Sequence, residues 1–169
     1  MKRALILTIA GLTAMLSGAA LAQNAPQAIG EYRDWSAWVY RNSGTKVCYI
    51  TSSPTETLPR GVNRGDIHFY VSHRPDQGVT GEISMILGYP FAENEEAIAR
   101  IGGSEFGMRT DGERAWTADP ADDSRFVNAM KAGRDMKVEG LSSRGTKTTD
   151  TYSLLGFTAA YDAIGKACN

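Results

Sequence analysis

Histidine and cysteine are scarce in this sequence, since each occurs only twice in 169 residues. The cysteines do not form a C-x-x-C motif, so nothing supports a thioredoxin-like redox function. No serine stands in a G-x-S-x-G context, which is the nucleophile motif of many hydrolases. The sequence therefore assigns no catalytic residue and no cofactor.

The two histidines, His68 and His73, lie in a segment whose apolar residues alternate as in a β-strand. Strand positions five apart point to opposite faces, so these side chains cannot converge on one metal ion without a bulge. We predict no metal site and expect both histidines on the surface. One alternative stays open, namely a periplasmic hydrolase in which His68 or His73 works with acidic partners.

The sequence also lacks a strong charge of either sign. Without Lys2 and Arg3, which precede the mature chain predicted below, 16 of the 18 basic residues remain against 19 acidic ones, a net charge near −3. This balance is not typical of a nucleic-acid-binding protein or of a polybasic membrane-surface protein. No segment after residue 22 is long and apolar enough to span a bilayer.

The N-terminus, in contrast, carries an export pattern. Two basic residues precede the apolar run ALILTIAGLTAMLSGAA, and Ala20 and Ala22 occupy the −3 and −1 positions of a signal peptidase site. A retained membrane anchor is the alternative, but Gly and Ser interrupt the run. We predict a signal peptide over residues 1–22 and one domain over 23–169, located in the periplasm, with outer-membrane association or secretion as alternatives.

Two cysteines remain in the mature chain, Cys48 and Cys168. In an exported protein an even count favours a disulfide. Two free thiols, an intermolecular bridge and a metal-binding pair are the alternatives. A Cys48–Cys168 bridge would close most of the domain into one loop, and the chain-entropy model gives an upper estimate of roughly 5 kcal/mol for such a bridge.

Alternation of apolar and polar residues predicts a mainly β fold. Ile67, Phe69 and Val71 share one face of a strand, and Asp111-Gly112 lies between two β-compatible arms, as in a type I′ hairpin. The predicted strands cover residues 34–41, 46–53, 66–73, 81–88, the two arms of 105–118, 134–144 and 145–153.

Three segments lack a regular period. Residues 23–30 are small and polar, and predict a flexible tail. Residues 53–65 are rich in Pro, Gly and Asn, and predict a loop. Residues 90–101 are compatible with a short helix, but a loop that runs into a strand is the favoured interpretation.

Two segments have helical signals instead. Asp119 is a suitable N-cap, Pro120 suits the first helical position and Gly133 follows the end, which predicts a helix near 120–132. Apolar residues at helical spacing predict a C-terminal helix near 155–167. The fold class is therefore a sandwich-like antiparallel β domain with two helices. The predicted core contains Trp35, Val47, Ile50, Ile67, Phe69, Val71, Ile83, Met85, Leu87, Trp116, Phe126, Met130, Val138, Leu154, Phe157 and Ile164.

The segment VEGLSSRGTKTTDTYSLLGF, residues 138–157, resembles a phosphate-binding loop at first sight. Gly140 and Gly145 have the four-residue gap, but that motif requires Lys directly after the second Gly, and Lys147 is displaced by one position. The following Thr-rich residues favour a strand instead of the helix that should follow a phosphate loop. The segment therefore predicts a hairpin whose turn is Arg144-Gly145.

The same segment resembles the C-terminal signature of the invasion-associated locus B family of exported bacterial proteins. The matching positions are Gly140, Ser142, Arg144, Gly145, Thr146, Thr148, Asp150, Tyr152, Ser153, Leu154, Gly156 and Phe157. The resemblance is strong over about the last 45 residues and looser over the rest of the mature chain. It implies a β-rich domain of the cell envelope, host-cell association in some members, and no established catalytic residue.

Four residues are candidates for binding a partner. Trp35 and Trp38 lie three apart and so point to opposite faces of a strand, where one is expected in the core and the other exposed. Arg144 and Lys147, near Asp150, could bind an anion or a partner, although a solvated turn with weak ion pairs is the alternative. We expect a non-enzymatic module that binds an envelope or host protein. A periplasmic enzyme and an envelope-stabilising, chaperone-like protein are the other hypotheses.

Overall fold

The structure is a computed structural model that describes residues 25–169. The predicted signal peptide, residues 1–22, lies outside the described residues. The strands are β1 (Gln27–Tyr32), β2 (Trp35–Asn42), β3 (Thr45–Ser52), β4 (Glu56–Leu58), β5 (His68–Arg74), β6 (Val79–Ile86), β7 (Ala97–Ile101), β8 (Ser104–Asp111), β9 (Arg114–Trp116), β10 (Asp135–Leu141) and β11 (Lys147–Ser153). The helices are η1 (Pro75–Gln77), α1 (Pro120–Ala132) and α2 (Phe157–Cys168).

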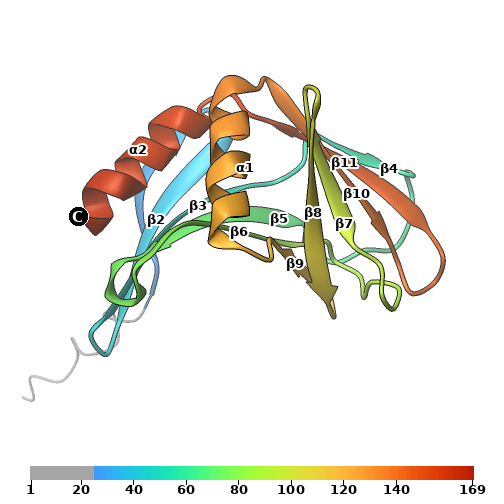
Figure 1. Cartoon of the computed structure of the whole chain (residues 1–169), viewed down its shortest axis with the longest axis horizontal. Coiled ribbons are helices and arrows are strands. Elements are labelled where there is room, and N and C mark those ends of the chain that lie inside the picture. The colour runs from blue at the N-terminus through green and yellow to red at the C-terminus, as the bar shows by residue number, and fades with distance from the viewer. Residues whose placement is uncertain (1–24) are drawn as a thin grey trace, which may run out of the picture.

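The strands form one antiparallel sheet in the order β1-β2-β3-β5-β6-β9-β8-β7-β10-β11-β4. The sheet folds over on itself between β9 and β8, as Figure 1 shows. We call β1, β2, β3, β5, β6 and β9 the first half-sheet, and the remaining strands the second half-sheet. The Phe69 ring on β5 lies 5.7 Å from the Tyr152 ring on β11, so the two inner faces share one core. The predicted β-rich, sandwich-like fold class is confirmed.

Both α-helices lie on the inner side of the sheet (Figure 1). Helix α1 begins where predicted, because the Asp119 carboxylate accepts a hydrogen bond from the Ala121 N–H at 2.7 Å. The Asp123 carboxylate accepts from the Ile83 N–H at 2.9 Å, which fixes this helix on β6. Helix α2 begins at Phe157, two residues later than predicted, after Gly156.

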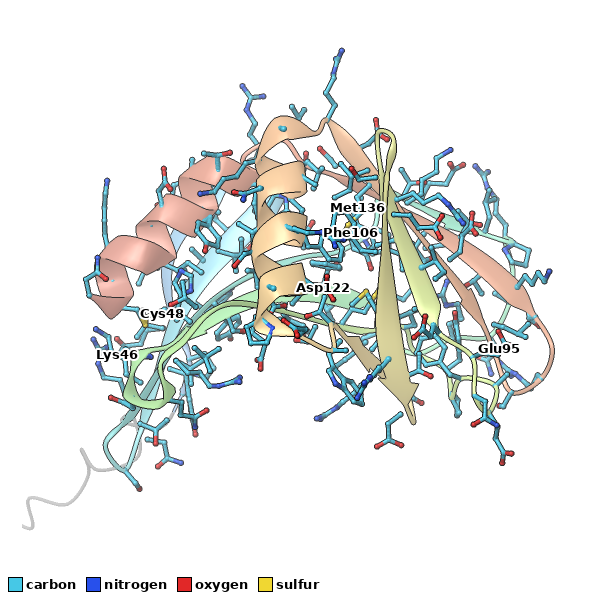
Figure 2. All side chains as sticks on the ribbon, viewed as in Figure 1. Lys46, Cys48, Glu95, Phe106, Asp122 and Met136 are labelled. Atoms are coloured by element: carbon cyan, nitrogen blue, oxygen red, sulfur yellow. A yellow bond between two sulfur atoms is a disulfide. The ribbon has the colours of Figure 1, made fainter. Side chains whose placement is uncertain are left out.

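The predicted core is largely confirmed, and Figure 2 shows how densely side chains fill the space between the helices and the two half-sheets. Trp116 is the clear error, because its side chain is 37 % exposed. Strand β9 has only three residues, and Ala115 is the one that faces inward. Val47 and Ile67 are only half-buried.

Two segments predicted to be irregular contain strands. Residues 27–32, which overlap the predicted flexible tail, form β1 and pair with β2. Most side chains of β1 are exposed, so backbone hydrogen bonds to β2 hold this strand in the sheet. Because no face of β1 is buried, its sequence shows no alternation of apolar and polar residues. Strand β4 lies inside the predicted loop 53–65 and pairs with β11. The loop-then-strand interpretation of residues 90–101 is confirmed by β7.

The hairpin at Asp111 is present, but its turn is shifted by one residue. Asp111 pairs with Arg114, so Gly112 and Glu113 are the two central residues. Gly112 has a φ of 55°, and Glu113 is not among the residues with positive φ. A positive φ at the first central position alone is the pattern of a type II′ turn, not of the predicted type I′.

Candidate functional site

The β10–β11 hairpin confirms the interpretation of residues 138–157 as a turn between strands. The Gly145 N–H donates to the Ser142 carbonyl at 2.8 Å, and Gly145 has a φ of 79°. The central residues of this turn are thus Ser143 and Arg144, one position earlier than predicted. The Thr146 N–H donates to the Ser142 hydroxyl at 3.1 Å, so side chain and backbone close the turn together.

Asp150 lies on the inner face of this hairpin and is completely buried. Its two carboxylate oxygens accept hydrogen bonds from Nη1 and Nη2 of Arg64, each at 2.7 Å. Arg64 also donates to the Leu87 carbonyl through Nε at 3.1 Å and Nη2 at 2.8 Å. Burial alone would lower the pKa of Arg64, but the hydrogen bonds and charge of Asp150 raise it, so the guanidinium remains charged.

This ion pair corrects the sequence interpretation of Asp150. We expected Asp150 near Arg144 and Lys147 in a solvated turn, but its ion pair is with Arg64, and neither Arg144 nor Lys147 forms a hydrogen bond or ion pair with it. Alternate residues of β11 face the core, so Asp150 follows Thr148 inward while Lys147 points to solvent. The Arg144 guanidinium instead donates to the Asn63 carbonyl at 2.8 Å. Arg64 was missed because it lies in the loop before β5, where no period marks it.

An aromatic ring encloses the ion pair on one side. The Arg64 guanidinium carbon lies 4.8 Å from the centre of the Tyr89 ring, a cation–π contact. The Tyr89 hydroxyl lies 2.6 Å from the Thr148 hydroxyl oxygen. Gly140 makes room for Tyr89, because a Cβ at this position would lie 2.5 Å from the Tyr89 hydroxyl oxygen. Burial raises the pKa of Tyr89, so its hydroxyl stays protonated.

The last residues of the family signature join the two half-sheets. The Trp35 indole N–H donates to the Ser153 carbonyl at 3.0 Å, and the Trp35 ring centre lies 5.1 Å from that of Phe157. Gly156 has a φ of 92°, and a Cβ there would lie 1.9 Å from the Tyr32 carbonyl oxygen. Trp35 is completely buried and therefore is a core residue, not a contact for a partner.

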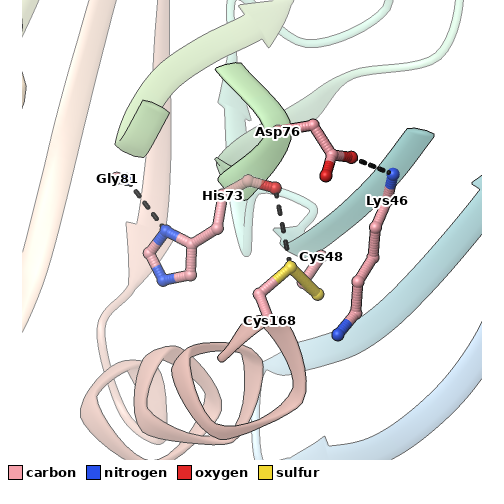
Figure 3. Close-up of a disulfide and its surroundings, with 6 residues drawn as sticks. All are labelled: Lys46, Cys48, His73, Asp76, Gly81 and Cys168. Carbon is pink, nitrogen blue, oxygen red and sulfur yellow. Dashed lines mark hydrogen bonds between the residues drawn. A yellow bond between two sulfur atoms is a disulfide. The ribbon is translucent and has the colours of Figure 1, made fainter. Parts of the chain in front are cut away.

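The predicted disulfide joins β3 to the end of α2, as Figure 3 shows. Cys48 and Cys168 are bonded, and no cysteine of the described residues is free. His73 lies beside the bridge, since its carbonyl oxygen is 3.8 Å from Sγ of Cys168. The Lys46 N–H donates to the Asp76 carboxylate at 2.8 Å and thereby holds η1 against β3.

His73 is buried, contrary to the predicted surface position. Its Nδ1 accepts a hydrogen bond from the Gly81 N–H at 2.9 Å, and its ring packs edge-on against Tyr161. Burial lowers the pKa of His73, so the imidazole is neutral. The alternation along β5 could have predicted this position, because His73 lies on the same inner face as Phe69 and Val71.

His68 lies on the other face of β5, half-buried, so the predicted divergence of the two histidines is confirmed. Its Nδ1 is 3.3 Å from the Ser53 hydroxyl oxygen. Within residues 25–169, no carboxylate forms a hydrogen bond or ion pair with either histidine. The same part of the chain contains no group of three or more His, Cys, Asp or Glu side chains placed to hold a metal ion.

The outer face of the first half-sheet carries a row of aromatic side chains. Trp38 on β2 pairs with Tyr49 on β3, and Ser84 on β6 pairs with both Tyr70 on β5 and Trp116 on β9. Directly paired residues of antiparallel strands point to the same face, so these rings share one surface. The Tyr49 and Tyr70 ring centres are 6.1 Å apart.

Part of this surface is hollowed into a groove of about 620 Å³, which we call the aromatic groove. Its walls include the rings of Tyr49, Tyr70 and Trp116, the hydroxyls of Ser72 and Ser84, and the charged side chains of Arg74, Glu82, Asp111 and Arg114. Burial raises the pKa of Tyr49 and of Tyr70, so both phenols stay protonated and can donate as well as accept hydrogen bonds.

A preformed ion pair fixes one end of the groove. The Arg74 guanidinium donates both Nη groups to the two carboxylate oxygens of Glu82. Its Nε donates to the Gln77 side-chain carbonyl at 2.9 Å, which further restricts the rotamer. These side chains are about one-third exposed, so they are ordered yet accessible to a ligand.

The outer face of the second half-sheet is charged instead of aromatic. Arg100 on β7 forms ion pairs with Glu105 at 3.0 Å and with Glu139 at 2.5 Å. Lys147 lies on the same face and is exposed. Of the four candidate partner-binding residues, only Trp38 lies on the aromatic surface, and Trp35, Arg144 and Lys147 lie elsewhere.

Comparison with known proteins agrees with the predicted resemblance. No described helix is long and apolar enough to cross a membrane. No significant match was found among curated proteins or among solved structures. The family model described as "Invasion associated locus B (IalB) protein" matches residues 35–165, from the first residue of β2 into α2. The match covers most of the chain, which therefore belongs to the invasion associated locus B family.

Proposed function

We propose that this protein is a non-enzymatic binding module of the cell envelope, and that it holds an envelope or host component in the aromatic groove. The observation that carries this proposal is the row of half-exposed Tyr and Trp rings on the outer face of the first half-sheet. Such rings provide contact area at low entropic cost and combine an apolar face with a polar group. The helices and the core occupy the opposite face of the same strands.

The location belongs to the same proposal. The basic and apolar N-terminus followed by Ala20-x-Ala22 supports export to the periplasm, and the Cys48–Cys168 bridge suits an oxidising compartment. A groove whose Arg74–Glu82 pair is already formed, on a sheet tied to α2 by the disulfide, supports binding without large rearrangement.

Capture from envelope extracts tests the proposal. Immobilised mature protein, residues 23–169, is compared with the double variant Tyr70→Ala/Trp116→Ala. The control is Arg100→Ala/Lys147→Ala, which removes two exposed side chains from the charged face. We expect a component that is retained by the wild type and the control but lost from the groove variant. Equal retention by all three proteins would contradict the proposal.

A second candidate function is hydrolysis, favoured by the contact between Ser53 and His68. The hydroxyl oxygen and Nδ1 are 3.3 Å apart, which is slightly longer than the usual reach between a nucleophile and its base. Within the described residues no carboxylate orients the imidazole, so binding is the better-supported function. Loss of an esterase activity in Ser53→Ala, with the activity kept in His73→Gln, would favour the enzyme.

A further inference from the structure

We propose that the ligand of the aromatic groove is a neutral oligosaccharide, held by the rings of Tyr49, Tyr70 and Trp116 and by the Arg74–Glu82 pair. This inference rests on the proposed function and names its ligand class. It depends on three properties of the groove: its place in the sheet, its charge and the geometry of its side chains.

The place of the groove in the sheet argues against an extended peptide. The strands that form its floor are β3, β5, β6 and β9. Strands β3 and β5 are paired on both sides, and β9 pairs with Ser84, Met85 and Ile86 of β6. Beyond the end of β9, the Asp123 carboxylate accepts a hydrogen bond from the Ile83 N–H of β6. Peptides that bind to sheets as an added strand need an exposed edge with free backbone groups. The outward N–H of β6 next to the groove is therefore already occupied, so a ligand is recognised mainly by side chains.

The charge of the groove argues against an ionic ligand. Two cationic side chains, Arg74 and Arg114, face two anionic ones, Glu82 and Asp111. Arg74 and Glu82 already neutralise each other in a bidentate pair. Because no net charge remains, the groove offers no electrostatic preference for a phosphorylated or sulfated chain.

The side chains suit a sugar ring. A pyranose presents a face of C–H groups and an edge of hydroxyls. Tyr and Trp rings supply flat apolar surfaces for the former. The phenols, Ser72 and Ser84 can donate to and accept from hydroxyls, and the Arg74–Glu82 pair presents fixed donors and acceptors beside them. Since this pair is ordered without ligand, binding costs little additional side-chain entropy.

The size of the groove suits several linked sugars. Its volume of about 620 Å³ lies within the ~300–1,000 Å³ that is usual for ligand pockets. The groove also extends across several strands of the sheet, from Tyr49 on β3 to Trp116 on β9. This shape favours an oligosaccharide over a single enclosed sugar.

Titration calorimetry with tetrasaccharides tests the inference on mature protein. The probes are the neutral chains chitotetraose and cellotetraose, the sulfated chain is a heparin tetrasaccharide, and a neutral unstructured decapeptide represents peptides. We expect a neutral tetrasaccharide to bind with an affinity that changes less than threefold between 50 and 300 mM salt, since few ionic contacts form. Tyr70→Ala/Trp116→Ala should reduce this affinity at least tenfold, and Arg100→Ala/Lys147→Ala should leave it unchanged.

The outcomes separate this inference from the proposed function. Binding of heparin or of the decapeptide in preference to both neutral chains would overturn it. If neither chitotetraose nor cellotetraose bound at millimolar concentration, the inference would also be overturned. Loss of envelope capture in the groove variant would in that case still support the proposed function. If capture and saccharide binding were both independent of the groove, both proposals would fail. Circular dichroism of each variant verifies that the fold is kept.

Discussion

The β10–β11 hairpin, together with Arg64 and Tyr89 that pack on it, and the aromatic groove both combine polar and aromatic side chains, but they place these residues differently. In the hairpin, Asp150 and Thr148 face inward, and Arg64 and Tyr89 satisfy their polar atoms. In the groove, the phenols and the Arg74–Glu82 pair stay partly open to solvent. The hairpin carries the recognisable family signature and the groove carries none. In this chain the signature thus coincides with a tightly constrained part of the fold, and the proposed binding groove lies outside it.

The largest expected effect comes from breaking the buried ion pair. Asp150→Ala leaves the Arg64 guanidinium buried without its counter-charge, which typically costs about 3–5 kcal/mol of unfolding free energy. Urea denaturation followed by circular dichroism measures this loss. A loss under about 1 kcal/mol would show that the hairpin tolerates an unpaired charge.

A double variant sharpens this test. Arg64→Met/Asp150→Leu removes both charges, and we expect it to recover most of the stability lost in Asp150→Ala. It should also keep the groove intact, because neither residue lines it. If the double variant binds the groove ligand as well as the wild type does, Arg64 and Asp150 stabilise the fold and do not take part in binding.

The second effect concerns the disulfide. Cys48→Ser/Cys168→Ser removes the bridge between β3 and α2, and we expect a loss of about 2–5 kcal/mol, measured by urea denaturation under oxidising conditions. The wild type in reducing buffer should match the variant. A stable variant with unchanged denaturation midpoint would show that packing of α2 alone holds the C-terminus.

The third effect is a pH dependence that originates at His73. Its pKa is lowered in the folded state by burial and, to a lesser degree, by the nearby charge of Lys131, while an unfolded chain has the ordinary value near 6.5. The unfolded state therefore binds a proton more readily, and stability falls as the pH drops below about 6.5 towards the folded pKa. His73→Gln should flatten the dependence of the denaturation midpoint on pH between pH 7.5 and 5.5, as measured by urea denaturation at each pH.

The smallest effect on stability is expected in the groove. Trp116 is 37 % exposed at the end of a three-residue strand, so Trp116→Ala should change the unfolding free energy by less than about 1 kcal/mol. The same substitution should nevertheless weaken groove binding strongly. A variant that loses several kcal/mol would place Trp116 in the core and remove it from the ligand site.

Most of what could be predicted came from the spacing of apolar residues along the chain and from helix-capping residues. It identified the inward residues of β5 and β6 and the start of α1, because burial and capping are local in the chain. It did not identify the partner of Asp150, since Arg64 comes from an irregular loop 86 residues away. The groove was also missed, because its rings are gathered from β3, β5 and β9 only when the strands pair. Trp116 was misassigned because a large aromatic residue was expected to be buried.

The contact between Trp35 and the end of β11 has a consequence for the order of folding. Trp35 begins β2, yet its indole donates to Ser153, 118 residues later, and its ring packs on Phe157. Contacts this distant in sequence close late and slow the search for the native state. The core of the first half-sheet cannot be completed until the final helix has arrived. The proposed export would benefit from such a delay, because a chain that crosses a membrane unfolded is blocked if it folds too early.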